Sequence, residues 1–284
     1  MRGFKIGLAL AGIAALAGCR DANKVTTAEL PPMAFVRFVN AVPDTGGQDW
    51  RFVDAVEYSP TTFNMKFRGV FPGASYQSAA AGNRHLTVFQ APIDLSNPTL
   101  STPAIVSTVF FDTTFNFVAG SHYTIIATGN MRAGGALPKK LIILKDDFSD
   151  PAASIAVRVV NTGAGTVDVY ASPTGGASTL PTSATAAGLA NYAASNYITM
   201  APGTLALRAL TAGTTTLPAL IDSPAPAGVA ADRVNNLTAV GGSTIAGSVF
   251  TAFVFPRSVS GSIASNFTTP GVVYAVDKYP PSGF

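Results

Sequence analysis

One strand-like pattern occurs twice in this chain and constrains the fold more than any other feature. Residues 36–40, Val-Arg-Phe-Val-Asn, alternate apolar side chains around Arg37, and residues 156–161 restate the pattern around Arg158. Alternation with a period of two predicts a β-strand that turns one face toward a core. In the first copy Val36 and Phe38 share that face and Arg37 points to the other. A chain that starts twice with the same strand is expected to build the same β-domain twice.

Further segments match between the two halves in the same order. Residues 50–53 correspond to 167–170, 82–88 to 202–207, 119–124 to 246–251, and 141–146 to 272–277. Turn signals follow one another at about eight- to twelve-residue intervals, as in antiparallel sandwiches. The sequence therefore predicts an all-β protein with two tandem antiparallel β-sandwich domains, at residues 34–150 and 151–284, that meet near Asp150 and Pro151.

Local signals predict some of the connections between strands. Gly82 and Asn83 favour a type I′ turn that leads into a strand at residues 84–90. Residues 105–111 and 114–118 are predicted as two strands. Residues 174–194 are almost all small, and we favour a loop or irregular strand there over a short helix at residues 186–194.

The first residues of the chain have the features of a bacterial export signal. Arg2 and Lys5 precede an uncharged apolar run at residues 6–16, which at about eleven residues is too short to span a bilayer. Leu16, Ala17 and Gly18 then form a lipobox before Cys19, the only cysteine. We predict that residues 1–18 are a lipoprotein signal peptide, recognised by signal peptidase at Leu16, Ala17 and Gly18, and that Cys19 is lipidated. The alternative is an ordinary secretory signal followed by an incidental cysteine.

Residues 19–33 are predicted to form the lipidated cysteine and a flexible tether, because they are polar and contain Pro31 and Pro32. About a dozen extended residues reach up to about 40 Å. Loss of Arg2 and Lys5 with the signal lowers the formal net charge of +3 by two, so charge gives no argument for nucleic acid. With its one cysteine acylated, the chain has no disulfide, and burial must stabilise the fold.

The opening residues 36–44, the later residues 157–161 and the Val-Asp-Val-Tyr segment at 167–170 resemble the bacterial family called domain of unknown function 4397. The resemblance extends over both copies, and Tyr123 and Thr124 match its later Tyr-Thr strand. Copy one departs at residues 50–53, and copy two lacks the Pro-Asp turn. The resemblance implies Ig-like β-sandwiches in exported, often surface-anchored proteins, and it implies no activity and no catalytic residues.

Residues that could carry catalysis or hold a metal are sparse. The histidines, His85 and His122, stand in predicted strands without the spacing of a zinc hydrolase. No Gly-x-Ser-x-Gly and no phosphate-binding glycine motif occurs. We predict that the protein is not an enzyme and needs no cofactor or metal.

Two acidic groups and one aromatic group are the remaining candidates for a site. Neither acidic group has the spacing of an EF-hand loop, but calcium stays open at the second group, where the domains meet. The groups are Asp44, Asp49 and Asp54, and Asp146, Asp147 and Asp150. Aromatic side chains of the first domain could stack on sugars, although alternate strand positions favour the core.

Trp50, Tyr58 and Tyr76 are the candidate ligand-binding residues, and we expect both tyrosines to be exposed. The leading hypothesis is a lipid-anchored cell-envelope protein, in the outer membrane or at the cell surface, with a non-catalytic binding or structural role. Its partners would be the membrane, through Cys19, and an envelope polymer, glycan or protein. The alternative is a carbohydrate- or polymer-binding module that uses the aromatics of the first domain.

Overall fold

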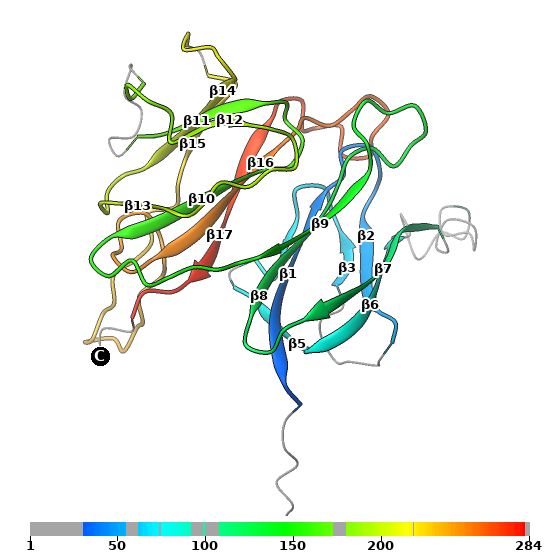
Figure 1. The fold of residues 1–284 in the computed structure, drawn as a ribbon. Coiled ribbons are helices and arrows are strands. Elements are labelled where there is room, and N and C mark those ends of the chain that lie inside the picture. The colour runs from blue at the N-terminus through cyan, green and yellow to red at the C-terminus, as the bar shows by residue number, and fades with distance from the viewer. Residues whose placement is uncertain are drawn as a thin grey trace, which may run out of the picture. The chain divides into compact units, whose positions relative to one another are not determined.

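The computed structural model describes residues 31–54, 62–73, 75–91, 99, 108–172, 180–217 and 219–281. These residues form seventeen β-strands and no helix, which confirms the predicted all-β class (Figure 1). Residues 32–284 make one compact unit. No helix in the described ranges is long and apolar enough to cross a membrane.

The first lobe, residues 32–150, contains two sheets. One has the order β4-β1-β8-β9, with β5 also paired to β1, and the other has the order β3-β2-β6-β7. β1 and β8 run parallel, and the other pairs are antiparallel. The strands are β1 (Met33–Ala41), β2 (Gln48–Phe52), β3 (Thr62–Met65), β4 (Val70–Phe71), β5 (Gln77–Ala80), β6 (Gly82–Gln90), β7 (Val109–Phe117), β8 (His122–Thr128) and β9 (Lys140–Lys145).

The second lobe, residues 151–281, repeats this connectivity. Its sheets have the orders β13-β10-β16-β17 and β12-β11-β14-β15, and β10 runs parallel to β16 as β1 does to β8. A bridge between Val160 and Ala194 stands where Val39 pairs with Val70 in the first lobe. The strands are β10 (Ile155–Asn161), β11 (Val167–Ser172), β12 (Ala186–Leu189), β13 (Ile198–Met200), β14 (Ala206–Thr211), β15 (Ile221–Pro224), β16 (Val249–Phe255) and β17 (Gly271–Lys278).

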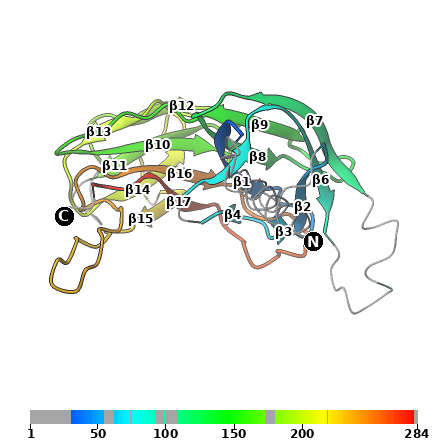
Figure 2. The ribbon, with the colours of Figure 1, turned by 90° about the horizontal axis from the view of Figure 1, so that it is seen from below.

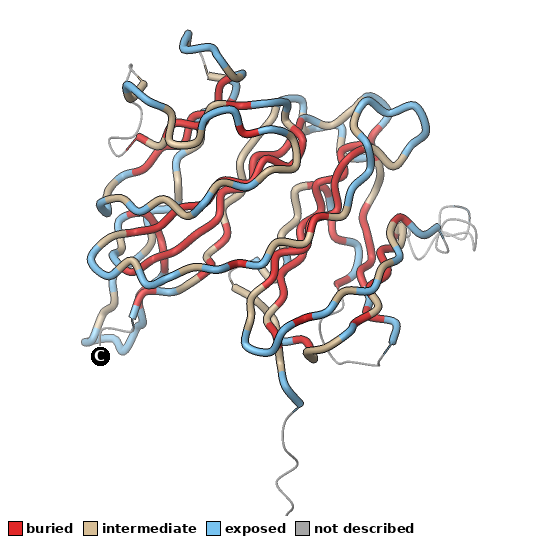
Figure 3. The backbone as a smooth tube through the Cα atoms, in the orientation of Figure 1, coloured by how far each residue is buried: buried red, intermediate tan, exposed pale blue. Residues whose placement is uncertain are grey.

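Each lobe encloses its own apolar core, and buried residues follow the strands of both (Figure 3). Val36 and Phe38 lie in the core of the first lobe, as their alternation predicts. Val159 lies in the main core cluster of the second lobe, and Val157 packs in an adjoining one. The equivalent strands β1 and β10 therefore both turn the predicted face inward.

A further apolar cluster joins the lobes. Val39 and Ile126 from the first lobe pack with Val160 and Phe253 from the second. Figure 2 shows β1, β8 and β9 in the first lobe and β10, β16 and β17 in the second, with the two groups adjacent. Since Val36 and Val39 are both fully buried, β1 has no solvent-facing side along its centre and separates one apolar cluster from the other.

The predicted hairpin turn at Gly82 and Asn83 is wrong. Both residues belong to β6, and β5 and β6 pair with different sheets, so the chain crosses from one sheet to the other at Ala81. Gly82 has φ of +100°, which a glycine adopts without strain. The same Gly-Asn signal thus marks a crossover between sheets, which local propensity does not distinguish from a hairpin.

Two other predictions met different outcomes. Residues 109–117 form the single strand β7 where we predicted two, because Asp112 and Thr113 pair with β6 without a break. At residues 186–189 the chain forms the strand β12, so the helix alternative is wrong. Residues 174–179 of that segment lie outside the described part of the chain.

Candidate functional site

Eight polar side chains gather between the lobes, and we call them the arginine–aspartate cluster. Each lobe supplies an arginine, a tyrosine, a threonine and an aspartate. The members are Arg37, Tyr76, Thr124 and Asp146 from the first lobe, and Arg158, Tyr197, Thr251 and Asp277 from the second. The arginines, threonines and aspartates are all at most 5% exposed.

Arg37 on β1 reaches across to the second lobe. Its Nη2 donates to Oδ1 of Asp277 at 2.6 Å and to the hydroxyl of Thr124, on the neighbouring strand β8, at 2.9 Å. The guanidinium lies 4.6 Å from the centre of the Tyr76 ring. A planar cation over an aromatic face is favourable, and more so when both are desolvated.

Arg158 on β10 makes the reciprocal set of contacts. Its Nη2 lies 2.7 Å from Oδ1 of Asp146 in the first lobe and donates to the hydroxyl of Thr251, on β16, at 3.0 Å. Its guanidinium lies 4.7 Å from the centre of the Tyr197 ring. Each arginine thus uses the threonine and tyrosine of its own lobe and the aspartate of the other.

The aspartates accept hydrogen bonds from their own lobes as well. Oδ2 of Asp146 accepts from Thr124 at 2.5 Å and lies 2.8 Å from the Tyr76 hydroxyl. Oδ2 of Asp277 accepts from Thr251 at 2.6 Å and from Tyr197 at 2.8 Å. These bonds orient each carboxylate toward the arginine of the opposite lobe.

Two arginines and two aspartates make the cluster neutral overall. Burial by itself lowers the pKa of Arg37, but the nearby Asp277 carboxylate, Tyr76 and Asp146 outweigh burial and raise it. The pKa of Arg158 is raised in the same way, with burial opposing the rise and Asp146 as the main cause of it. Burial, followed by the charge of Asp277, raises the pKa of Tyr76 and of Tyr197. The arginines stay charged and the tyrosines stay protonated donors, so the cluster suits structural pairing better than proton transfer.

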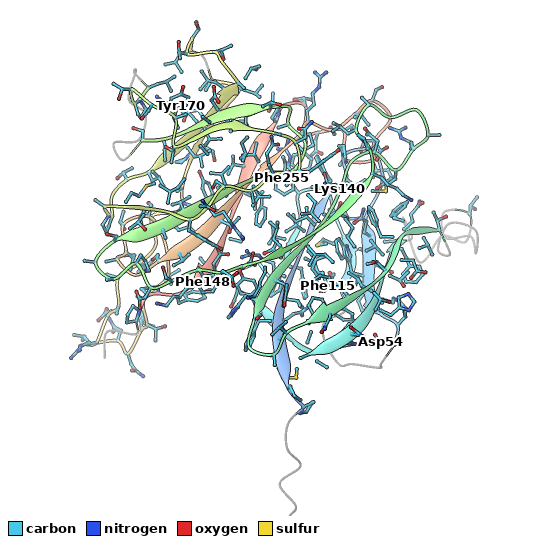
Figure 4. All side chains as sticks on the ribbon, viewed as in Figure 1. Asp54, Phe115, Lys140, Phe148, Tyr170 and Phe255 are labelled. Carbon is cyan, nitrogen blue, oxygen red and sulfur yellow. The ribbon has the colours of Figure 1, made fainter. Side chains whose placement is uncertain are left out.

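The aromatic candidates do not form a surface platform. Trp50 is fully buried and packs 5.1 Å from the ring of Phe38, so its expected availability to a ligand is wrong. Tyr76 is partly buried beneath Arg37 and close to Phe148, which lies where the lobes approach each other (Figure 4), so its expected exposure is wrong too. Both rings gain more by burial than by facing water. Tyr58 lies outside the described residues.

The histidines take separate structural contacts. His85 is partly exposed, with its Nε2 2.5 Å from Asp112. His122 stacks on Phe35 at 4.8 Å and meets the edge of Tyr76. Among the described residues no group of three or more His, Cys, Asp or Glu side chains could hold a metal ion.

The acidic residues are used singly. Asp44 accepts from the backbone of Met131 and Arg132, Asp49 accepts from the backbone of Asn64, and Asp54 pairs with Arg84. In the second group Asp146 pairs with Arg158, Asp147 with Lys145 and Asp150 with Lys278. The three carboxylates that left calcium open are thus each directed to a different cation.

A cleft of about 520 Å³ lies at the loop ends of the two lobes. Its walls come from the loops that follow β1, β8, β10 and β16, represented by Pro43, Leu137, Gly163 and Val259. Arg257 brings a positive charge to walls that are otherwise apolar or small and polar. A cleft of this size can take a small ligand or a short chain segment with an anionic group.

The comparisons with known proteins bear on the first lobe and on the start of the second. Residues 34–170 match the family model described as Domain of unknown function (DUF4397). The chain contains one DUF4397 domain. The matched DUF4397 range begins within β1 and ends within β11, so it passes the predicted junction at Asp150 and Pro151 and includes Arg37, Asp146 and Arg158. No curated protein matches the chain.

The sequence predicted equivalences between the lobes but not the cluster itself. The matched segments already align Arg37 with Arg158, Thr124 with Thr251, and Asp146 with Asp277. Tyr197 was missed, because the small residues around it gave no strand pattern. Charged residues that recur at matched positions are the signal that points to the cluster. Leu16, Ala17, Gly18 and Cys19 lie outside the described residues.

Proposed function

We propose that this protein is exported and lipid-anchored at Cys19, and that it serves the cell envelope by binding or structure rather than by catalysis. The lipobox at residues 16–19, behind a basic and apolar leader, is the observation that carries the proposal. The compact unit begins at Pro32, which leaves a short segment after Cys19 to act as a tether. Two or three acyl chains would anchor it stably.

The use of charged side chains supports a non-catalytic role. Arg37, Asp146, Arg158 and Asp277 neutralise one another between the lobes. A general base or nucleophile needs an accessible group with a pKa matched to its task. The cluster instead buries its ionisable groups and holds them in fixed pairs.

We further propose that the two lobes are tandem copies of one Ig-like module. Support comes from the equal strand orders, from the parallel pairs β1/β8 and β10/β16, and from the matched cluster residues. The family match over residues 34–170 covers the first copy and continues past the junction into β11. In this proposal the loop-end cleft, built by both lobes, is where a partner binds.

The anchor is tested by replacing Cys19 with Ala and following the protein by cell fractionation and fatty-acid labelling. We expect the variant to lose the label and leave the membrane fraction, while Arg20→Ala keeps both. Retained lipid labelling in Cys19→Ala would refute the anchor.

The binding role is tested by cross-linking in intact envelopes. A photoreactive amino acid at Leu220, which lines the cleft and is 40% exposed, should capture a defined component. The same amino acid at Leu237, 58% exposed and outside the cleft lining, is the matched control. Equal capture at both positions, or none at Leu220, would contradict binding at the cleft.

One surface ring favours carbohydrate binding as a second candidate. Phe63 is 65% exposed, and the Arg51 guanidinium lies 5.2 Å from its centre. Glycan-array binding that Phe63→Ala abolishes, and that Val53→Ala leaves intact, would support this role, because Val53 is another exposed apolar residue of the first lobe, at 48%. Binding unaffected by Phe63→Ala would contradict it.

A further inference from the structure

We propose that the arginine–aspartate cluster selects a docking partner by exchanged ion pairs. The β1-β8-β9 face of one lobe is thus a docking surface for a second module of the same kind. The inference rests on the proposed duplication and deepens it. Each face presents an arginine that needs an aspartate from outside its lobe, and an aspartate that needs an arginine. Such a face is complementary to another copy of itself, as in a two-fold symmetric dimer.

The two contributions are equivalent in sequence as well as in space. Tyr76 follows Arg37 by 39 residues, and Tyr197 follows Arg158 by the same interval. The arginine stands opposite the threonine in both parallel ladders, since Arg37 pairs with Thr124 and Arg158 with Thr251. The same backbone positions thus aim the same chemical groups at the boundary.

The exchange of partners distinguishes docking from internal stabilisation. Arg37 lies 2.6 Å from Asp277 of the other lobe and 3.8 Å from Asp146 of its own. Arg158 lies 2.7 Å from Asp146 of the other lobe. If the clusters served each lobe alone, the shorter contacts would be expected within the lobes.

The surroundings of the cluster make these pairs selective. Val39, Ile126, Val160 and Phe253 pack beside it and exclude water. An unrelated apolar surface that docked here would bury Arg37 without Asp277 and Asp146 without Arg158, which is strongly unfavourable. The occupant that fits is a module with the same four polar groups.

The junction between the lobes allows a direct test in the full-length protein. Ala152 and Ala153 are exposed, so a protease site inserted between them can be cut after folding. We expect the cut lobes to stay together during size-exclusion chromatography at micromolar concentration. Separation of the cut wild-type lobes would overturn docking and leave the lipid anchor unaffected.

The role of the exchanged pairs is tested with an isosteric variant. Asp277→Asn keeps the side-chain volume and removes the charge that faces Arg37, and we expect the dissociation constant of the cut lobes to rise at least about tenfold. Asp147→Asn is the matched control, because Asp147 is 74% exposed and pairs with the exposed Lys145. Circular dichroism before cutting verifies the fold. An unchanged dissociation constant in Asp277→Asn would overturn the proposal that exchanged ion pairs select the docking partner.

Discussion

Nη2 of Arg37 donates to Oδ1 of Asp277 at 2.6 Å, although 240 residues separate them in sequence. Arg158 and Asp146 make the reciprocal ion pair. Both pairs are almost completely removed from water, where leaving one partner alone is costly. The stability of each lobe is therefore tied to the presence of the other.

The core of the first lobe should be sensitive at Phe38. This ring is fully buried and packs against Trp50 and Phe52. Phe38→Ala should lower the free energy of unfolding by about 3–5 kcal/mol, measured with urea, because it opens a cavity in a packed core. Phe63→Ala, 65% exposed, should change it by no more than about 0.5 kcal/mol. Equal losses would contradict the assigned core.

The loop after β8 should depend on Gly129. Its φ is +82°, and a Cβ there would lie against the carbonyl of Pro138. Gly134 has φ of +77° and open space around it. Gly134→Ala should cost about 1 kcal/mol for the backbone conformation, and Gly129→Ala should cost clearly more because it adds a steric clash. Thermal unfolding of the two variants makes the comparison, and similar melting temperatures would refute the close approach.

Stability should fall as the solution becomes mildly acidic. Burial lowers the pKa of His122 from its ordinary value near 6.5, although Asp146 and Asp277 act to raise it. The unfolded chain then binds a proton more readily than the folded one, so this contribution is complete above about pH 6.5 and is lost as the pH falls below it. His122→Phe should weaken the dependence of the unfolding free energy between about pH 7.5 and 5.5. An unchanged dependence would exclude His122 as its source.

The strands were predictable where apolar side chains recur at every second residue. Val36 and Phe38 stand on either side of Arg37 and both lie in the core, so the period of two predicted β1 correctly. The hairpin prediction at Gly82 was wrong because a glycine with positive φ occurs at a crossover between sheets as well as in a hairpin turn. The pairing partners of β5 and β6 are set by tertiary contacts. Local signals contain no information about which sheet a strand joins.

The interface was harder to predict than the cores. Arg37 and Asp146 resemble solvated residues in sequence, since their burial depends on partners from the other lobe, Asp277 for Arg37 and Arg158 for Asp146. Trp50 and Tyr76 were misjudged for a related reason, because aromatic composition does not reveal which ring a neighbouring lobe or sheet covers. Only the repetition of charged positions in both halves pointed toward a shared role.

The two single replacements at the lobe boundary should each be severe. Arg37→Met leaves Asp277 without its cation, and Asp277→Leu removes the nearer of the two carboxylates around Arg37, so each should cost about 3–5 kcal/mol. Arg51→Met is the control, because Arg51 is 48% exposed and lies 3.6 Å from Asp49. It should cost less than about 1 kcal/mol.

The double-mutant cycle over Arg37 and Asp277 is the most direct measurement of whether exchanged pairs join the lobes. Equilibrium urea unfolding of the wild type, Arg37→Met, Asp277→Leu and the double variant gives their coupling energy. We predict that the double variant loses at least about 1.5 kcal/mol less than the two single losses added together. Losses that add to within about 0.5 kcal/mol would contradict the account.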